Sequence, residues 1–303
     1  MALLWGASWP AGRTLALEMP PLAGSAWRIS LAALLMLGWM AWRFGRWPVL
    51  TPRQWLALAA AGAIGVAGYA VFFMLALNRV EASRAAVVVT TNPVFVTLLA
   101  AWLFKEKFNA RIAFGLACAV LGAATVLTQG APWKLLVGEV GTGEWLLLGC
   151  IATWVGYTLI GRALLADIDS LVATTISVLF GTALLWVAAL AVEGPGVAAQ
   201  SLETLSWPGW LSLVFLAVGS TVLAYAWYFR GVGELGAGTA ASYISLVPVF
   251  GVASSALMLG ERLDASLLAG GALAIAGVVI TNRARRAVAA ESPSRVEAAH
   301  VAE

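Results

Sequence analysis

Histidine, cysteine and charged residues are scarce in this sequence of 303 residues. It contains one histidine and two cysteines, and only 11% of its residues are charged. His300 lies in a polar C-terminal segment, whereas Cys118 and Cys150 lie inside apolar runs. We therefore interpret the cysteines as packing residues and predict neither a metal site nor a cofactor.

Several functional motifs are also missing. No glycine-rich loop ending in Gly-Lys-Ser/Thr occurs, so we do not expect the chain to hydrolyse ATP. The motifs HExxH and GxSxG and paired aspartates inside apolar runs are absent, which argues against an enzyme. The net charge of +3 is too small to indicate a nucleic-acid partner. No aspartate or glutamate lies in the middle of an apolar run, so a carboxylate proton relay has no obvious position.

Apolar residues make up 61% of the sequence, and its mean hydropathy is +0.90. The charges fall in short breaks between apolar runs of about 17–25 residues, the length that a helix needs to cross a bilayer. The sequence therefore predicts an all-α membrane protein in the lipid bilayer. We expect ten transmembrane helices near residues 2–18, 22–42, 54–77, 83–104, 110–128, 144–165, 170–192, 207–230, 236–260 and 264–282.

Lysine and arginine are unequally distributed between the two sides of these predicted helices. If the N-terminus is cytoplasmic, most of them, including Arg43, Lys105 and Arg162, fall on the cytoplasmic side, and few, such as Lys134, fall outside. This bias predicts that both termini are cytoplasmic. The segment 283–303 is rich in Ala, Ser and Glu, and we expect it to be a disordered cytoplasmic tail.

One stretch of the sequence occurs twice, 155 positions apart. Asn92-Pro93-Val94-Phe95 leads through an apolar run to Lys105-Glu106-Lys107, and Val247-Pro248-Val249-Phe250 leads in the same way to Gly260-Glu261-Arg262. The same offset relates further residues across three predicted helices without a gap. A repetition of this length indicates that half of the chain was duplicated.

The duplication divides the chain into residues 1–128 and 144–282, joined by a connecting loop at 129–143. Each part holds five predicted helices, and because five is odd the second copy crosses the membrane in the opposite direction. Inverted repeats are typical of alternating-access transporters, whose substrate site lies near the midplane between the copies. The sequence therefore predicts two inverted five-helix repeats around a central cavity.

The sequence resembles the EamA-type proteins of the drug/metabolite transporter superfamily, which have ten helices in two tandem repeats. The resemblance rests on Arg28 of the second helix, on the two proline-to-glutamate segments, and on the motifs Trp5-Gly6-Ala7-Ser8 and Trp154-Val155-Gly156-Tyr157. It implies export of small metabolites through the inner membrane of a bacterium. Within the superfamily, the chain looks most like bacterial exporters of aromatic and other neutral amino acids.

Prolines and polar residues inside the helices form the first candidate site. Thr90, Thr91 and Asn92 precede Pro93, and Ser242, Tyr243 and Ser245 precede Pro248. A proline in mid-span frees a backbone carbonyl, and neighbouring hydroxyl or amide groups can then face polar atoms of a substrate. We interpret the polar residues as substrate-binding and the two prolines, with Pro10, as bending points. Alternatively, the polar groups only satisfy the interrupted helix.

Aromatic residues form a second candidate group. Tyr69 and Phe73 share one helix face, and Tyr225 and Tyr228 share another. We predict that Trp9, Tyr69, Phe73, Trp154 and Tyr157 contact the substrate, and that Tyr225 and Tyr228 form a gate. The alternative is an aromatic belt at the membrane boundary, because the sequence contains fifteen tryptophans.

Four charged residues complete the candidates. Arg13 and Arg28 could each meet a substrate carboxylate, but both can also reach the membrane boundary and pair with Glu18, and we favour this structural interpretation. We interpret Glu106 and Glu261 as structural, with each carboxylate bound by a partner such as the N-terminus of the following helix. The glycine-rich stripes around residues 115–122 and 270–277 are predicted to pack helices within the chain, although a dimer contact is the alternative. We expect a monomer or a homodimer.

Together these features predict a secondary or facilitative transporter that exports neutral or aromatic amino acids and related small metabolites by alternating access. A carrier of nucleotide sugars or phosphorylated metabolites is an alternative, and it should show several basic groups in its cavity. A broad drug exporter is another alternative. A membrane receptor or assembly subunit that transports nothing is the alternative from a different class.

Overall fold

The computed structural model describes residues 1–105, 108–131, 133, 141–165, 167–235 and 243–290, and every regular element among them is helical. The elements are α1 (Ala2–Glu18), α2 (Pro21–Phe44), α3 (Pro52–Ala61), η1 (Gly62–Gly68), α4 (Tyr69–Leu77), α5 (Ala82–Val89), α6 (Asn92–Phe104), α7 (Ala110–Leu127), α8 (Thr142–Leu164), α9 (Ser170–Ala188), η3 (Ala189–Glu193), α10 (Pro195–Glu203), α11 (Trp207–Val214), η4 (Phe215–Leu223), α12 (Ala224–Leu235), α14 (Val247–Leu259) and α15 (Ala265–Ala290). The segments written η are π-helices.

Eight helical segments are long and apolar enough to cross a membrane, which confirms the predicted all-helical membrane protein. They span Pro21–Phe44, Pro52–Leu77, Ala82–Phe104, Ala110–Leu127, Thr142–Leu164, Ser170–Glu193, Trp207–Tyr228 and Ala265–Ala287. Two further predicted spans are shorter, since α1 has 17 residues and α14 has 13. The predicted span 236–260 lies partly outside the described residues.

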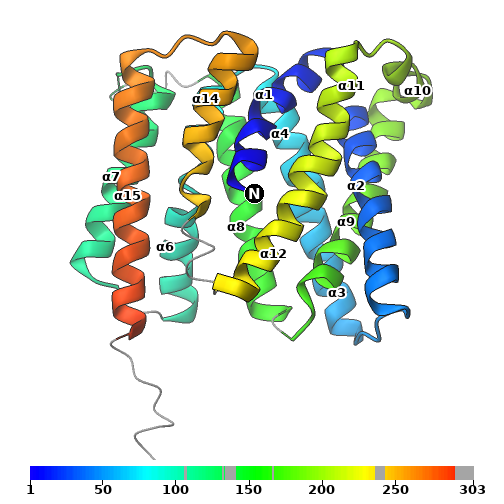
Figure 1. The fold of residues 1–303 in the computed structure, drawn as a ribbon, viewed down its shortest axis with the longest axis horizontal. Coiled ribbons are helices and arrows are strands. Elements are labelled where there is room, and N and C mark those ends of the chain that lie inside the picture. Colours follow the sequence, from blue (N-terminus) through cyan, green and yellow to red (C-terminus); the bar gives the residue numbers. More distant parts are fainter. Residues whose placement is uncertain (106–107, 132, 134–140, 166, 236–242, 291–303) are drawn as a thin grey trace, which may run out of the picture.

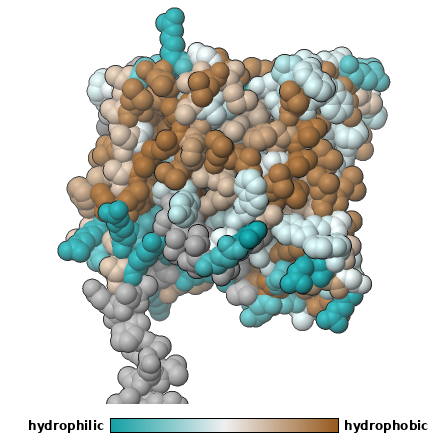
Figure 2. Space-filling model, in the orientation of Figure 1, coloured by the Kyte–Doolittle hydropathy of each residue, from teal (hydrophilic) through white to brown (hydrophobic). Residues whose placement is uncertain are grey.

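The helices stand side by side in a bundle (Figure 1). α7 and α15 form one edge, α2, α3 and α9 form the other, and α1 lies in the middle against α14, α4 and α11. α2, α6, α8 and α15 end, and α3 begins, at the bottom of Figure 1, which we name the basic end because Arg43, Lys105, Arg162 and Arg283 lie there. α1 and α14 end at the top, which we name the opposite end. Figure 2 shows an apolar surface across the middle of the bundle and hydrophilic residues gathered mostly at the basic end.

Helix starts recur at the 155-residue offset of the repeated sequence. Asn109 caps α7 by accepting from the backbone N–H of Ile112, at 2.9 Å. Asp264, which lies 155 positions later, caps α15 in the same way by accepting from Leu267, at 2.8 Å. A side-chain oxygen at this position satisfies one of the free N–H groups of the first turn, so both helices begin where their sequences carry a capping residue.

Helix ends and irregular segments recur in the same way. α6 ends at Lys105 with φ +52°, and α14 ends at Gly260 with φ +66°, so both helices stop in the left-handed conformation. The π-helices η1 and η4 interrupt the third and the eighth predicted helix, and the range of η1 shifted by 155 positions falls within η4. α3 begins with Pro52 at the basic end, whereas α11, which begins with Trp207 155 positions later, starts at the opposite end (Figure 1).

The glycine stripes pack α7 against α15 within the chain, as predicted. A Cβ atom added to Gly122 would lie 2.4 Å from the backbone nitrogen of Ala274, and one added to Gly277 would lie 2.3 Å from that of Ala119. No side chain fits in this contact, so the two backbones approach closely.

Candidate functional site

Five of the predicted substrate-binding residues form one continuous row of rings, here named the aromatic row. Trp9 of α1 lies 5.2 Å from Phe73 of α4, measured between ring centroids, and Phe73 lies 6.0 Å from Tyr69. Tyr69 lies 5.7 Å from Trp154 of α8, which lies 6.1 Å from Tyr157. Trp9 and Phe73 are buried, and the other three are partly buried. The contacts join helices across the interior, which favours an internal site over an aromatic belt.

A second group, here named the aromatic gate, consists of Trp5, Tyr225 and Tyr228. The Trp5 ring lies 5.5 Å from Tyr225 and 5.7 Å from Tyr228, and its indole Nε1 donates to the Ser220 carbonyl at 2.9 Å. Ser220 belongs to the π-helix η4. The backbone N–H of Ala224, one turn later, donates to the carbonyls of Gly219 and Thr221 and not to that of Ser220. The two tyrosines were predicted as a gate, but Trp5 was not recognised as their partner.

The row and the gate contain matching contacts. Trp5 opens the first repeated motif and contacts the helix that follows η4, whereas Trp154 opens the second motif and contacts Tyr69, the residue that follows η1. Each tryptophan therefore reaches the third helix of the other half of the chain. This equivalence with Trp154 is the signal that could have identified Trp5 from the sequence.

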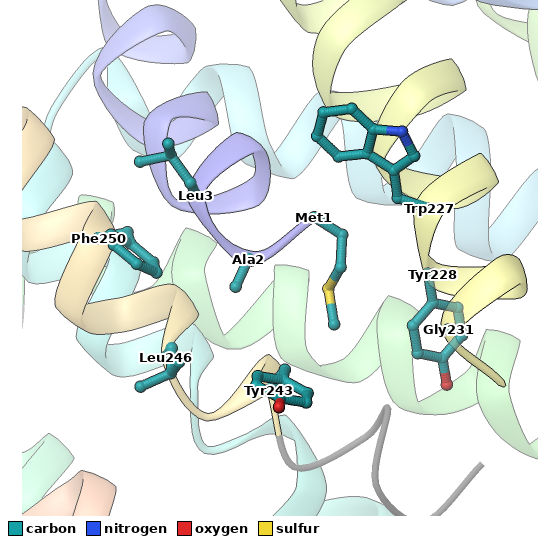
Figure 3. A pocket seen from close by; sticks show the side chains of 9 residues that line it. All are labelled: Met1, Ala2, Leu3, Trp227, Tyr228, Gly231, Tyr243, Leu246 and Phe250. Carbon is teal, nitrogen blue, oxygen red and sulfur yellow. The ribbon is translucent and has the colours of Figure 1, made fainter. Parts of the chain in front are cut away.

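A cavity of about 410 Å³ lies beside the aromatic gate. Figure 3 shows it below the first turn of α1, between α12 and the start of α14, and its lining includes Met1, Tyr228, Tyr243 and Phe250. Residues 1, 5 and 9 fall on one face of α1 because they are four positions apart. The cavity, the gate and the aromatic row thus follow one another along α1, from the basic side toward the opposite end.

Arg28 is 8% exposed, and its guanidinium lies 5.0 Å from the centroid of the Phe73 ring. Its Nε has no hydrogen-bond partner among the described residues. Glu18, the expected partner, instead accepts from the backbone N–H and the hydroxyl of Ser206, at 3.0 and 2.7 Å. The structure therefore places Arg28 at the aromatic row and not in the expected contact with Glu18.

Arg13 has a different environment. It donates to the carbonyls of Leu77, at 3.1 Å, and Val80. Its Nε also lies 3.7 Å from an Oε1 of Glu261. These contacts tie α1 to the end of α4 and to the chain beyond α14, which favours the structural interpretation of Arg13.

Glu261 accepts from the backbone N–H groups of Ala82 and Ser83, at 2.8 and 2.9 Å. Its partner is thus the N-terminus of α5, in the other half of the chain, and not the following helix α15. The negative carboxylate lies at the positive end of the α5 dipole, where it is stabilised. Glu193 makes the same pair of contacts with Leu22 and Ala23 at the start of α2, both at 2.8 Å. Glu106 lies outside the described residues.

The polar residues around Pro93 have divided roles. The hydroxyl of Thr90 donates to the Ala86 carbonyl and that of Thr91 donates to the Val88 carbonyl, both at 2.7 Å, so both threonines satisfy their own helix. Asn92 is buried, and its Oδ1 has no partner in the described part of the chain. Of the three residues, Asn92 alone keeps an unused polar group that could face a substrate.

Both repeated prolines occupy the first turn of a short helix, Pro93 in α6 and Pro248 in α14. A proline is tolerated there because the first-turn N–H groups have no partner within the helix. Tyr243 lines the cavity, and Ser245 is partly buried beside it in the chain, whereas Ser242 lies outside the described residues. Pro10 lies inside α1, which continues past it to Glu18.

The fold defines a multi-pass helical membrane protein with an aromatic interior. The sequence matches the EamA-like transporter family over residues 1–128 and again over residues 141–283. The chain therefore belongs to the EamA-like transporter family and is a transporter, not an enzyme.

Several relatives match along most of their length. The Bacillus subtilis protein "Uncharacterized transporter YyaM" is 26% identical over 259 residues, which cover 86% of this chain and 83% of the relative. The Escherichia coli protein "Probable amino-acid metabolite efflux pump" is 25% identical and covers 92% and 91% of the two chains. The Streptantibioticus cattleyicolor protein "Probable terminal-alkyne amino-acid exporter" is 28% identical and covers 75% and 72%. One solved crystal structure matches the fold with a TM-score of 0.63 and 18% identity, over 94% of this chain and 95% of the other.

Proposed function

We propose that this protein exports neutral amino acids, aromatic ones among them, and related small metabolites by alternating access between two inverted five-helix repeats. The observation that carries the proposal is the reciprocal pairing of Trp5 with Tyr225 and of Trp154 with Tyr69 across the two halves of the chain. Two equivalent aromatic contacts, one made by each half of the chain, are what a central site shared by two repeats requires.

The repeats, at residues 1–128 and 144–282 with a connecting loop between them, are supported by several observations. The family match falls in two segments of similar extent. Helix caps, π-helices and left-handed helix ends recur 155 positions apart, on helices of opposite direction. Because the basic end carries most lysines and arginines, we assign it to the cytoplasmic side of a bacterial inner membrane, with both termini cytoplasmic.

The amino-acid substrate class is supported by the composition of the site. The rings of the aromatic row provide apolar faces for a side chain of similar character. Two of the relatives described above have names that refer to amino-acid export or efflux. A carrier of nucleotide sugars or phosphorylated metabolites needs several basic groups in its cavity, but Arg13 is already bound to carbonyl oxygens and to Glu261.

The test is exchange of radiolabelled amino acids by purified protein in liposomes, across a panel of side chains, with and without a pH gradient. We expect neutral amino acids to move without ATP. Replacing Trp154 by Ala should reduce exchange at least about tenfold, since it removes a ring contact at the site. The matched control is Trp42→Ala, because Trp42 is 83% exposed on the outer surface of α2. The proposal fails if no amino acid moves under any condition.

A further inference from the structure

Arg28 is a buried cation without a counter-ion in the part of the chain that the structure describes. The other arginines of the helical interior are bound: Arg13 contacts two carbonyls and Glu261, and Arg84 contacts Glu81, Asp264 and the Val126 carbonyl. Arg28 makes no ion pair with a described carboxylate, and its buried Nε has no acceptor. A guanidinium inside a membrane protein is costly unless an anion or a set of acceptors compensates it.

The neighbours of Arg28 do not provide that compensation. The guanidinium lies over the Phe73 ring, and this cation–π contact is weaker than the bidentate hydrogen bonds that a carboxylate offers. Tyr69 and Cys150 also lie close enough to interact with its charge. Both are neutral in their ordinary states, so the positive charge remains unmatched.

The position of Arg28 also indicates what would match its charge. Arg28 comes from α2, whereas the aromatic row comes from α1, α4 and α8, and the two meet at Phe73. An anionic group bound by Arg28 would therefore place an attached apolar group against Trp9, Phe73 and Tyr69. A planar carboxylate fits the two parallel donors of a guanidinium.

We propose that Arg28 binds the carboxylate of the transported molecule, so that the site selects monocarboxylates with an apolar or aromatic side chain. This inference rests on the transport function proposed above. It identifies the carboxylate as the recognised group and gives the amino group a lesser role. Arg28 then remains without a protein partner because its partner is the substrate.

The experiment measures binding by thermal stabilisation of the purified protein, using three compounds that share one ring. They are L-phenylalanine, 3-phenylpropionate, which lacks the amino group, and phenethylamine, which lacks the carboxylate. We expect the first two to stabilise the wild-type protein and phenethylamine to do so only at about 10- to 100-fold higher concentration, the ratio that one charged hydrogen-bond pair supplies. In Arg28→Gln all three should bind equally weakly.

Arg28→Lys keeps the charge but loses the bidentate geometry, so it should retain part of the preference for carboxylates. Arg13→Gln is the matched control, since it removes a neighbouring intramembrane arginine with structural contacts. It should lower the melting temperature but leave the carboxylate preference unchanged. Inorganic phosphate should not displace bound 3-phenylpropionate from the wild-type protein.

Three results would overturn the inference. The wild-type protein could bind phenethylamine as well as 3-phenylpropionate, Arg28→Gln could keep the wild-type preference, or phosphate could displace the carboxylate. The proposed function fails separately, by absence of amino-acid exchange in liposomes, because 3-phenylpropionate binding needs no transport. Arg28→Gln should remain folded, since Arg28 makes no hydrogen bond to a described residue that its loss would break.

Discussion

Replacing Glu261 by Gln tests whether this carboxylate holds the two halves of the bundle together at the opposite end. The Glu261 side chain is 7% exposed and accepts from the backbone N–H groups of Ala82 and Ser83, at 2.8 and 2.9 Å, and the Arg13 Nε lies 3.7 Å from it. Glutamine keeps one acceptor oxygen but points its amide N–H₂ at a backbone N–H. One charge-assisted hydrogen bond contributes about 1.5–3 kcal/mol, and the charge at a helix N-terminus contributes up to about 2 kcal/mol in a partly buried site.

These contributions overlap, so we expect a loss of about 2–4 kcal/mol in the free energy of unfolding. In a protein of this size that corresponds to a drop of roughly 5 °C in melting temperature. The assay is thermal unfolding of the purified protein in detergent, together with amino-acid exchange in liposomes. Substrate selectivity should stay as in the wild type, because the Glu261 side chain contacts none of the aromatic row.

Glu193→Gln is the matched control, because Glu193 binds the first turn of α2 through the same two backbone contacts. Glu193 is partly buried and has no arginine among its contacts in the described chain, so its replacement should cost about half as much. If Glu261→Gln left the melting temperature within 1 °C but altered selectivity, Glu261 would be a substrate ligand and the structural interpretation would be wrong.

Two further predictions concern the α7–α15 pair and the cap of α15. Gly122→Ala should lower the free energy of unfolding by about 1–3 kcal/mol, because the added Cβ meets backbone atoms at 2.4–2.5 Å. Gly38→Ala is the control: a Cβ added there has no atom within 4 Å, so the free energy of unfolding should stay unchanged or rise. Hydrogen bonds from Ser266 and Leu267, and then Arg84, hold the pKa of Asp264 below its ordinary value. Wild type should therefore melt at a higher temperature than Asp264→Asn above pH 4, and this difference should disappear as the pH falls through the lowered pKa. The difference should be small, about 2 °C or less, because the Asp264 side chain is well exposed.

Most of the fold could be predicted from the sequence, because membrane helices depend on local properties. Apolar length and the charged breaks placed α7 at 110–128, against Ala110–Leu127 in the structure. The capping residues Asn109 and Asp264 stand in the sequence directly before the helices that they cap. Such local features determine where a helix starts and ends, whatever its neighbours are.

The site was predicted in part. Spacing on a helix correctly grouped Tyr69 with Phe73 and Tyr225 with Tyr228, because residues three or four apart share a face. Spacing along one helix cannot show which helices face each other. The partners of Arg28 and Glu261 lie on other helices, so spacing could not predict them. Glu18 lies ten positions before Arg28, yet it binds Ser206 of a distant segment. Interhelical partners therefore came only from the structure.

Charged contacts join the two halves of the chain at the opposite end. Arg13 and the N-terminus of α5, in the first half, bind Glu261 of the second, and Arg84 binds Asp264 across the same boundary. With these contacts formed, the cavity lies on the basic side of the aromatic gate. In the alternating-access mechanism proposed above, opening at the opposite end would separate these groups, so we expect that weakening one contact increases the population of the state open at that end.

Cys150 provides a native reporter of that state. It is fully buried and lies near Arg28, whereas Cys118 is partly exposed and can be replaced by Ala. In the Cys118→Ala background, a membrane-impermeant thiol reagent added outside should label Cys150 slowly. Asp264→Asn should increase the labelling rate several-fold, and 3-phenylpropionate should protect Cys150. Equal rates in the two proteins would show that the Arg84–Asp264 pair does not hold the opposite end closed, and the outward opening would then have to occur elsewhere in the bundle.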